Sequence, residues 1–526
     1  MTPGITSRYR GTRSGGARPS ARLLGAVIRV LLGVSALGWL GGCADREGEA
    51  QQAMKGAAQE MVEARRLESE SYAAALERYE AALAVVGKVR TEYADTPAGA
   101  LAGKPSTYVG PVTLGVLDSV VLPAVRRRAE AEASPLACAA FMAETIPGPA
   151  PRVQALATVA KAAAQLDRTT IAGRMLKVAQ ATAAGLPAGS EAQDHAWESV
   201  ADTLIAARDL EQARSLILAH GFEGPWQRLA VALVKTGQTQ RAAGMVAHSL
   251  GGAPMPRLEA RAVIAAALWR EGDTARAQQL MNEAEYWAKA VTPEEVPRAG
   301  LVLARHYAMQ RALPQADSWL TQVDGLRVAN RDELDGLVEA YRAGGGESRL
   351  LARVHDQLTS IEAGTTALPS SEVPWLANVA YLQAKLGEAE PGAFALSQAR
   401  TRADAISAVD SPPGLDLEVT TLMDISERLL TIGHIQPGLG ALEDALDRVR
   451  RYPLPMRPPF LLRAAKLAAY GGKADRALNL IEQLTTQEQI AGALAEAAQA
   501  SRGGLVASPR SLHDLAARFD TLEGLH

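Results

Sequence analysis

Few residues of this sequence have both the type and the spacing that catalysis or metal binding requires. The eight His are scattered. Six of them lie on or beside expected helices, with no second His or Cys three or four positions away: His195, His220, His248, His306, His355 and His434. The motifs His-Glu-x-x-His, Gly-x-x-x-x-Gly-Lys-Ser/Thr and Gly-x-Ser-x-Gly do not occur. We therefore expect no catalytic residue, no cofactor and no metal, and an enzyme with a dispersed site is the minor alternative.

Cys43 is the residue best placed for a chemical modification. Six Arg and no carboxylate precede an apolar run, Val30 to Leu40, which is followed by Gly41, Gly42 and Cys43. A basic stretch, about a dozen apolar residues and small residues before a cut are typical of a secretory signal. The apolar run is too short for a stable transmembrane span. The sequence therefore predicts a signal peptide over residues 1–42, with an ordinary signal or short membrane anchor and an incidental Cys as the alternative.

The segment Leu40-Gly41-Gly42-Cys43 resembles the lipobox of bacterial lipoproteins. The resemblance implies that the Cys43 thiol receives a diacylglycerol, that the leader is cut before Cys43, and that the new amino group is acylated, as with palmitate. Two or three acyl chains hold a protein on a membrane. Ala44, not Asp, follows the Cys, which in the proteobacterial sorting pattern implies the periplasmic face of the outer membrane and not the inner membrane.

The second cysteine, Cys138, lies in an apolar helical stretch from Pro135 to Met142. With Cys43 acylated it has no partner within the chain, so no disulfide framework is expected. We expect a buried, inert thiol, and a redox or intermolecular role is the alternative.

The composition of the 526 residues favours helices. Aromatic residues make up only 4%, and alternating runs of β-branched residues are absent, which argues against a β-sandwich or a doubly wound sheet. Without the six Arg of residues 1–42, the remaining 49 basic and 58 acidic residues leave a net charge of about −9. A general nucleic-acid binder should instead carry a basic stripe, so no nucleic-acid partner is expected.

The stretch from Trp226 to Val246 has the spacing of two antiparallel helices. Leu229 and Leu233 lie on one face of a first helix, because positions four apart stack on the same side. Gly237 can adopt the left-handed conformation that ends a helix, and Ala242 falls where the two helices approach most closely. Such a hairpin cannot bury its own apolar face, so an array of hairpins is expected.

The residue pattern of this stretch resembles one tetratricopeptide repeat, and variants of it recur along most of the chain. The resemblance implies an all-α fold, a right-handed α-solenoid of antiparallel helix pairs. It also implies repeat-packing roles for the following residues: Trp197, Ala213, Trp226, Gly237, Ala242, Gly272, Ala277 and Ala316. The pattern is lost at Arg208 and Arg311, where Gly is expected, and at Gly392 and Gly438, which replace the packing Ala.

In tetratricopeptide proteins the ligand usually lies in the concave groove, against the first helices of the pairs. By motif position the resemblance places these residues in the groove: Glu198, Asp202, Gln227, Val231, Ala262, Trp269, Arg305, Asp335, Glu339 and Arg342. This mixture does not match the Lys/Asn-rich clamp that some members use for a terminal carboxylate. We expect Trp269, Arg305 and Arg342 to contact a partner, because exposed aromatic and Arg side chains most often dominate interfaces.

The predicted organisation has six parts: residues 1–42, signal peptide; 43–98, N-terminal helical region after the lipid anchor; 99–150, linker and irregular helical segment; 151–370, first part of the array; 371–504, second part; and 505–526, C-terminal capping helix. The run from Tyr79 to Pro97 resembles the repeats of envelope-assembly lipoproteins. A coiled-coil arm for self-association is the alternative for this region.

These features predict a lipid-anchored, extracytoplasmic scaffold that binds protein partners in a bacterial envelope and that is not an enzyme. The membrane contact would be the N-terminal lipid. A structural or assembly factor for envelope or outer-membrane proteins is the alternative, because the anchor and the Tyr79 to Pro97 resemblance occur together.

Overall fold

The computed structural model describes residues 43–247, 253–323, 325–327, 329–364, 372–403 and 412–518. Most of these residues are helical, and their strands are the two-residue antiparallel pair β1 (Tyr108–Val109) and β2 (Val112–Thr113). The predicted helical fold class is therefore confirmed. The predicted signal peptide lies outside the described residues. Contacts divide the chain into two compact units, residues 1–65 with 77–122 and residues 66–76 with 123–526.

The first unit is built on two long antiparallel helices. Its elements are α2 (Cys43–Leu67), most of α3 (Tyr72–Glu92), α4 (Pro97–Ala102), β1, β2, α5 (Leu114–Val116) and η1 (Leu117–Val121). Arg46 of α2 pairs with Asp95 at 2.7 Å, and Glu60 of α2 pairs with Arg78 of α3 at 3.0 Å. The second pair joins α2 to α3, and the first joins the start of α2 to the turn that follows α3. The apolar stripe of α3 is buried at Tyr79, among other positions.

Residues 99–150, predicted as a linker and irregular helical segment, contain several short regular elements. They hold the end of α4, the β1–β2 pair, α5, η1, α6 (Leu122–Glu132) and α7 (Pro135–Thr145). The Thr96 side chain accepts a hydrogen bond from the backbone N–H of Gly99, and Pro97 occupies the first turn of α4. A capping hydroxyl and a first-turn Pro begin a helix even in a Gly-rich segment, which explains the difference.

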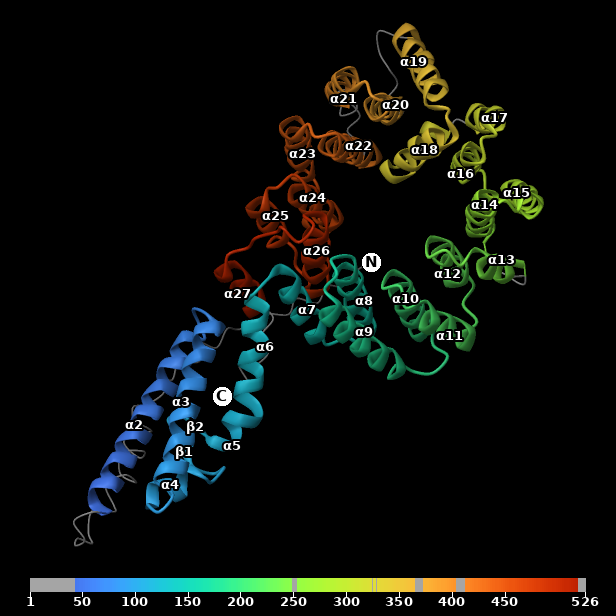
Figure 1. The fold of residues 1–526 in the computed structure, drawn as a ribbon. Coiled ribbons are helices and arrows are strands. Elements are labelled where there is room, and N and C mark those ends of the chain that lie inside the picture. The colour runs from blue at the N-terminus through green and yellow to red at the C-terminus, as the bar shows by residue number, and fades with distance from the viewer. Residues whose placement is uncertain are drawn as a thin grey trace, which may run out of the picture. The chain divides into compact units, whose positions relative to one another are not determined.

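The second unit is an array of helical hairpins (Figure 1). Each hairpin has a first and a second helix, with bounds in chain order as follows: α8 (Pro149–Gln165) and α9 (Thr169–Ala184), α10 (Glu191–Ala206) and α11 (Leu210–His220), α12 (Glu223–Lys235) and α13 (Thr239–Ala247), α14 (Pro254–Glu271) and α15 (Thr274–Ala288), α16 (Val296–Met309) and α17 (Leu313–Val323), α18 (Arg331–Gly344) and α19 (Glu347–Gly364), α20 (Val373–Lys385) and α21 (Ala389–Ala403), α22 (Pro412–Thr431) and α23 (Ile435–Val449), α24 (Pro458–Tyr470) and α25 (Ala474–Ile481). The helices α26 (Gln487–Ala500) and α27 (Pro509–Ala517) follow, and η2 (Gly325–Arg327) and η5 (Leu454–Met456) are short 3-10 turns.

The turn inside a hairpin depends on one residue with positive φ. Gly237 and Gly272 take this role with φ of 77° and 89°. Arg208 and Arg311, where the repeat pattern expects Gly, adopt φ of 63° and 61°. A side chain in this region costs about 1–2 kcal/mol, so the hairpins with Arg keep the turn in spite of that cost.

Small residues set the closest approach of the two helices of a hairpin. Ala213, Ala242, Ala277 and Ala316 are completely buried. Gly392 occupies the corresponding place in a later hairpin, where a β-carbon would lie 2.6 Å from the backbone nitrogen of Ala384. Replacement of the packing Ala by Gly therefore brings those helices closer together, and the hairpin is preserved.

Two Trp side chains pack beside these close approaches. Trp197 and Trp226 are partly buried against the core of the second unit. The indole N–H of Trp226 donates to the backbone oxygen of Met245, 3.4 Å away, which ties α12 to α13.

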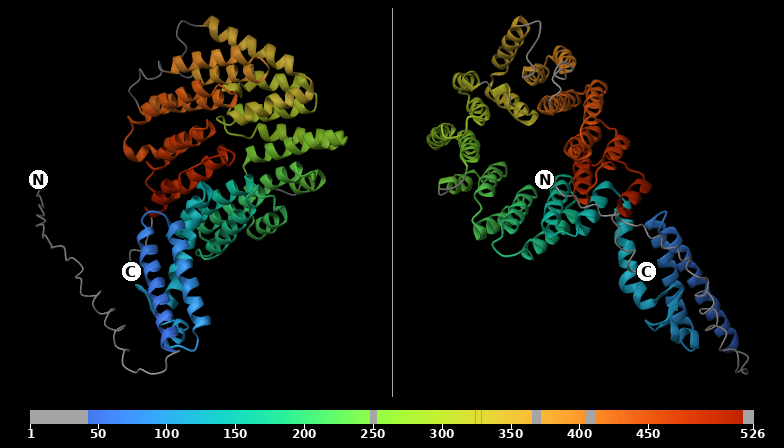
Figure 2. Two further views of the ribbon diagram at one scale, coloured as in Figure 1. Left: turned by 60° about the vertical axis from the view of Figure 1, so that its left-hand side comes forward. Right: turned by 180° about the vertical axis from the view of Figure 1, so that it is seen from behind.

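The first helices of the hairpins form a closed circuit of contacts. Each packs on the next from α8 to α24, α24 packs on α26, and α26 packs on α8. The α7 helix lies against both α26 and α8. It thus occupies the place that the second helix of a hairpin takes, with α26 as the first helix. Figures 1 and 2 show α24, α26, α7 and α8 side by side. Helices near the two ends of the second unit thus complete one hairpin, which the sequence analysis did not predict.

Polar contacts join the helices of this closing hairpin. The Gln487 side-chain amide of α26 donates to the backbone oxygen of Met142 in α7 at 2.8 Å. Buried His513 of α27 lies 2.8 Å from the carboxylate of buried Glu132. Because α27 also packs on α7, the C-terminal helix covers the closing hairpin.

The close-packing role of Ala242 leads to a stability prediction. Ala242→Asp places a carboxylate between α12 and α13, where no solvent reaches, and should cost about 3–5 kcal/mol. Gly244→Asp adds the same group at an exposed position of α13 that has open space around it, and should change stability little. Urea unfolding followed by circular dichroism measures both. Equal losses in the two variants would contradict the assignment.

Candidate binding groove

Two neighbouring hollows lie along the first helices of the array. One, of about 700 Å³, is lined mainly by α12, α14, α16 and the start of α18. The other, of about 560 Å³, is lined mainly by α10, α12 and α14. Val231, Lys235 and Glu259 line both hollows. Because of these shared residues we treat the two as one site, and we call it the inner groove.

The helical repeat explains which side chains face the inner groove. On α12, Gln227, Val231 and Lys235 are four residues apart and share one face. On α14 and α16 the same spacing brings Val263 and Val302 to the floor of the groove. Each helix therefore contributes an apolar centre with polar side chains on either side of it.

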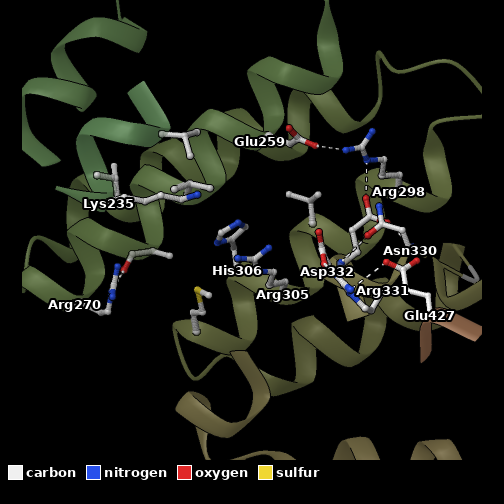
Figure 3. A pocket seen from close by; sticks show the side chains of 17 residues that line it. Lys235, Glu259, Arg270, Arg298, Arg305, His306, Asn330, Arg331, Asp332 and Glu427 are labelled. Carbon is white, nitrogen blue, oxygen red and sulfur yellow. Dashed lines mark hydrogen bonds and ion pairs between the residues drawn. The ribbon is translucent and has the colours of Figure 1, made fainter. Parts of the chain in front are cut away.

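One side of the inner groove is cationic. Lys235 and Arg270 line it, and Arg305 lies between the two sides of the groove (Figure 3); among the residues that the structure describes, no carboxylate lies within ion-pair distance of these three cations. The Arg305 Nε atom is buried without a hydrogen-bond partner. Gly336 of α18 makes room for this side chain, because a β-carbon there would lie 2.8 Å from the Arg305 Cζ atom. The structure thus accommodates three positive charges at the groove without neutralising them.

The other side carries carboxylates held by Arg. Arg298 lies between Glu259, at 3.3 Å, and Glu333, at 2.8 Å. Arg331 pairs with Glu427 of α22 at 3.1 Å. Figure 3 shows this cluster apart from Lys235 and Arg270. Burial raises the pKa of Glu259, although the nearby Arg298 opposes the shift. The inner groove is therefore polarised, with unpaired cations on one side and paired carboxylates on the other.

Two buried polar side chains of the groove have atoms without partners. His306 is 3% exposed, and its Nδ1 atom makes no hydrogen bond. Gln227 is also 3% exposed, and neither its amide nitrogen nor its amide oxygen has a partner. An unsatisfied buried polar group costs about 1–3 kcal/mol. These atoms are therefore candidates for bonds to a ligand.

His306 is neutral in this environment. Burial, together with the positive charges of Arg305 and Arg270, lowers the pKa of His306 to about 3. At physiological pH the imidazole is a hydrogen-bonding group and adds no charge to the cationic side of the groove.

Of the three residues predicted to contact a partner, one lines the inner groove and two do not. Arg305 lines the inner groove, as do Gln227 and Val231 of the wider predicted set. Trp269 is partly buried against the core and does not line it, and exposed Arg342 pairs with Glu347 at 2.6 Å. Sequence reasoning missed Lys235, although it follows Gln227 by eight residues on the same face. It also missed Arg270, eleven residues after Glu259 on α14.

Other members of the predicted groove serve the array itself. Glu198 and Asp202 hold Arg228 at 3.3 and 2.6 Å. Asp335 accepts a hydrogen bond from the Tyr381 hydroxyl at 2.8 Å. Ala262 is completely buried, and Glu339 is exposed.

The structure describes the side chain of Cys138 but not that of Cys43. Cys43 is the first described residue and begins α2, but its side chain is not described. Cys138 is free and completely buried, and burial raises the pKa of its thiol to about 12. A thiol with so high a pKa is a poor nucleophile, which agrees with the expected inert role.

The described part of the chain contains neither a membrane-spanning helix nor a metal-binding cluster. Its helices include none that is long and apolar enough to cross a membrane. Its His, Cys, Asp and Glu side chains form no group of three or more that could hold a metal ion.

Comparisons with known proteins do not assign a family. No model of a known protein family matches the sequence, and no curated protein matches it significantly. Ton1535 from Thermococcus onnurineus NA1 is 15% identical, with a TM-score of 0.22 over 73% of this chain and 99% of that one. A circular tandem repeat protein with novel repeat topology is 14% identical, with a TM-score of 0.18 over 90% of this chain and 99% of that one.

The shifted pKa of His306 leads to a prediction about acid stability. In the unfolded chain His306 takes up a proton near pH 6.5, whereas in the folded protein it does so near pH 3. Between these values the unfolded state binds more protons, so stability falls as the pH falls. At pH 5 this group should lower the free energy of unfolding by about 2 kcal/mol relative to pH 7.5.

His306→Gln removes the titrating group and should reduce that acid-induced loss. His195→Gln is the control, because the His195 side chain is 63% exposed. Thermal unfolding of the three proteins at pH 7.5 and pH 5 measures the effect. The same acid-induced loss in wild type and His306→Gln would contradict the prediction.

Proposed function

We propose that this protein is a lipid-anchored scaffold that binds protein partners through the inner groove, on the periplasmic face of a bacterial outer membrane. The single observation that carries the binding role is the inner groove, with its unpaired cations and its buried polar atoms that lack partners. The anchor and the location rest on the resemblance of Leu40 to Cys43 to a lipobox.

The side chains of the inner groove support binding more than catalysis. Glu259, Glu333 and Glu427 are held by Arg298 or Arg331, so these carboxylates are already paired. His306 is buried and neutral, and its open nitrogen suits a hydrogen bond to a ligand. We therefore propose that the protein is not an enzyme.

The proposal includes the finer fold class, a right-handed tetratricopeptide-like superhelix. Tyr307 and Tyr341, 34 residues apart, donate to Glu285 and Asp317 of the preceding second helices, each at 2.8 Å. Equivalent residues thus make equivalent contacts one repeat later. The distance of 34 residues is the period of the tetratricopeptide family.

An assembly role for envelope proteins is the second candidate, because the first unit exposes large apolar side chains. Leu101, Tyr108 and Val116 are 49%, 70% and 45% exposed. The Thr107 hydroxyl donates to the Leu101 backbone oxygen at 2.6 Å, so the segment that carries them is held in place. Exposed apolar residues of this kind suit contact with another protein.

Crosslinking in cells followed by affinity purification tests the proposed function. Wild-type protein labelled with a palmitate analogue should carry the label and recover specific envelope proteins. Cys43→Ser should lose the label, accumulate as unprocessed precursor and recover fewer of these proteins, because the thiol is the proposed site of lipid attachment. Cys138→Ser, which changes a buried thiol, is the control and should keep the label.

The outcomes separate the candidate functions. Transient capture of varied peptide-like clients supports the binding scaffold, whereas stable partners in fixed stoichiometry support the assembly role. Labelling that persists in Cys43→Ser refutes the lipid anchor. Failure of wild-type protein to recover any specific protein refutes the scaffold.

A further inference from the structure

We propose that the inner groove binds an extended, acidic segment of polypeptide. A side-chain carboxylate of the segment meets Lys235 and Arg270, and the backbone N–H and C=O of one of its residues pair with the Gln227 amide. This inference rests on the proposed binding function and adds to it the chemical class of the partner.

The Gln227 amide identifies the kind of backbone that fits. A primary amide offers both a donor and an acceptor, and both are buried and unpaired in this side chain. The N–H and C=O of one residue in an extended chain point to the same side and can satisfy both at once. Because neither amide atom is open to solvent, the Gln227 side chain has to turn toward the hollow to make these bonds. His306 offers one further nitrogen in the adjoining hollow.

The three cations specify the charge of the segment. Lys235, Arg270 and Arg305 line the same hollow without carboxylate partners among the described residues. Hydrogen bonds between Arg or Lys and a carboxylate are stronger than neutral ones. A basic segment would instead place positive charge against positive charge.

The paired carboxylates on the opposite side set the position of the acidic residue. Glu259 and Glu333 share one Arg, Arg298, so that side of the groove holds more negative than positive charge. A carboxylate of the ligand is repelled there and attracted to Lys235 and Arg270. The polarised groove therefore selects where the acid lies as well as the sign of its charge.

The extent of the groove favours a chain over a small molecule. It crosses the first helices from α10 to α18, and packed helices lie about 8–10 Å apart. Five such helices span roughly 35 Å, which corresponds to about ten residues of extended chain. The apolar floor at Val231, Val263 and Val302 provides contacts for aliphatic side chains between the polar ones.

A library of random ten-residue peptides tests the proposal. The peptides carry an acetyl group and a terminal amide, so every carboxylate belongs to a side chain. The probe is applied to the full-length protein, and affinities of selected peptides are measured by fluorescence anisotropy. We expect selected peptides to be enriched in Asp and Glu flanked by aliphatic residues, and a change of the acid to Lys should weaken binding at least tenfold.

Three variants locate the binding. Lys235→Glu reverses a charge of the groove, and Gln227→Leu removes both atoms that pair with the ligand backbone, so each should weaken binding at least tenfold. Gln227→Leu replaces an unpaired buried amide by an apolar group and should fold at least as well as wild type. Lys289→Glu, at an exposed position outside the groove, is the matched charge-reversed control and should bind within twofold of wild type.

Several results would overturn the inference. These are selected peptides without acidic residues, binding that is unchanged in Lys235→Glu and Gln227→Leu, or equal binding of the capped single residue N-acetylglutamate amide. If the library yields no binder while crosslinking in cells still recovers specific proteins, the acidic-segment inference fails and the scaffold function stands. If neither experiment recovers a partner, both fail.

Discussion

The packing of first helix on first helix is the interaction on which the second unit depends. A single hairpin leaves one face of its first helix uncovered, and the next hairpin buries that face. Fully buried Leu229, Leu258 and Leu337 lie on three of these first helices. In an open array the terminal helices would remain uncovered. Here α26 covers α8, and α7 completes the hairpin of α26, so the described array has no uncovered first helix at either end.

The same layer of first helices determines where a ligand can bind. Some polar groups in the body of the array are paired, as the Tyr341 hydroxyl is with Asp317, whereas others, such as the Thr421 and Ser426 hydroxyls, are buried without a partner. The Gln227 amide and His306 Nδ1 are also buried, at the groove, and have no partner. Buried polar atoms normally find a partner within the protein. At the inner groove these atoms lie beside a hollow and beside unpaired cations, and that combination makes the groove the candidate site.

The local structure of the hairpins could be predicted from the sequence. Spacing identifies the turn at Gly237 and the close approach at Ala242, because both depend on residues near one another in the chain. The same pattern places Arg305 at the groove. The pattern could not show which groove side chains are already held by hydrogen bonds or ion pairs within the protein. Asp335, for example, is held by Tyr381, which lies 46 residues further along the chain.

Features that depend on distant segments could not be predicted. The closing hairpin joins α7 and α26, and the bond between Gln487 and Met142 spans 345 residues. Neither helix carries a signal of its partner, because an apolar helical face fits many neighbours. Within residues 99–150 the sequence indicates the helix around Cys138, whereas the Gly-rich segment that follows Pro97 hides the helix that the Thr96 cap begins.

Hydrogen exchange measured by mass spectrometry tests the closure of the array most directly. In the intact protein, backbone amides of α7 and α26 should be protected as strongly as those of α14, in the middle of the array. Removal of residues 487–526 should lower the protection of α7 and α8 and leave that of α14 unchanged. Rapid exchange of α7 in the intact protein, or unchanged protection of α7 and α8 after the removal, would contradict the closed circuit of first helices.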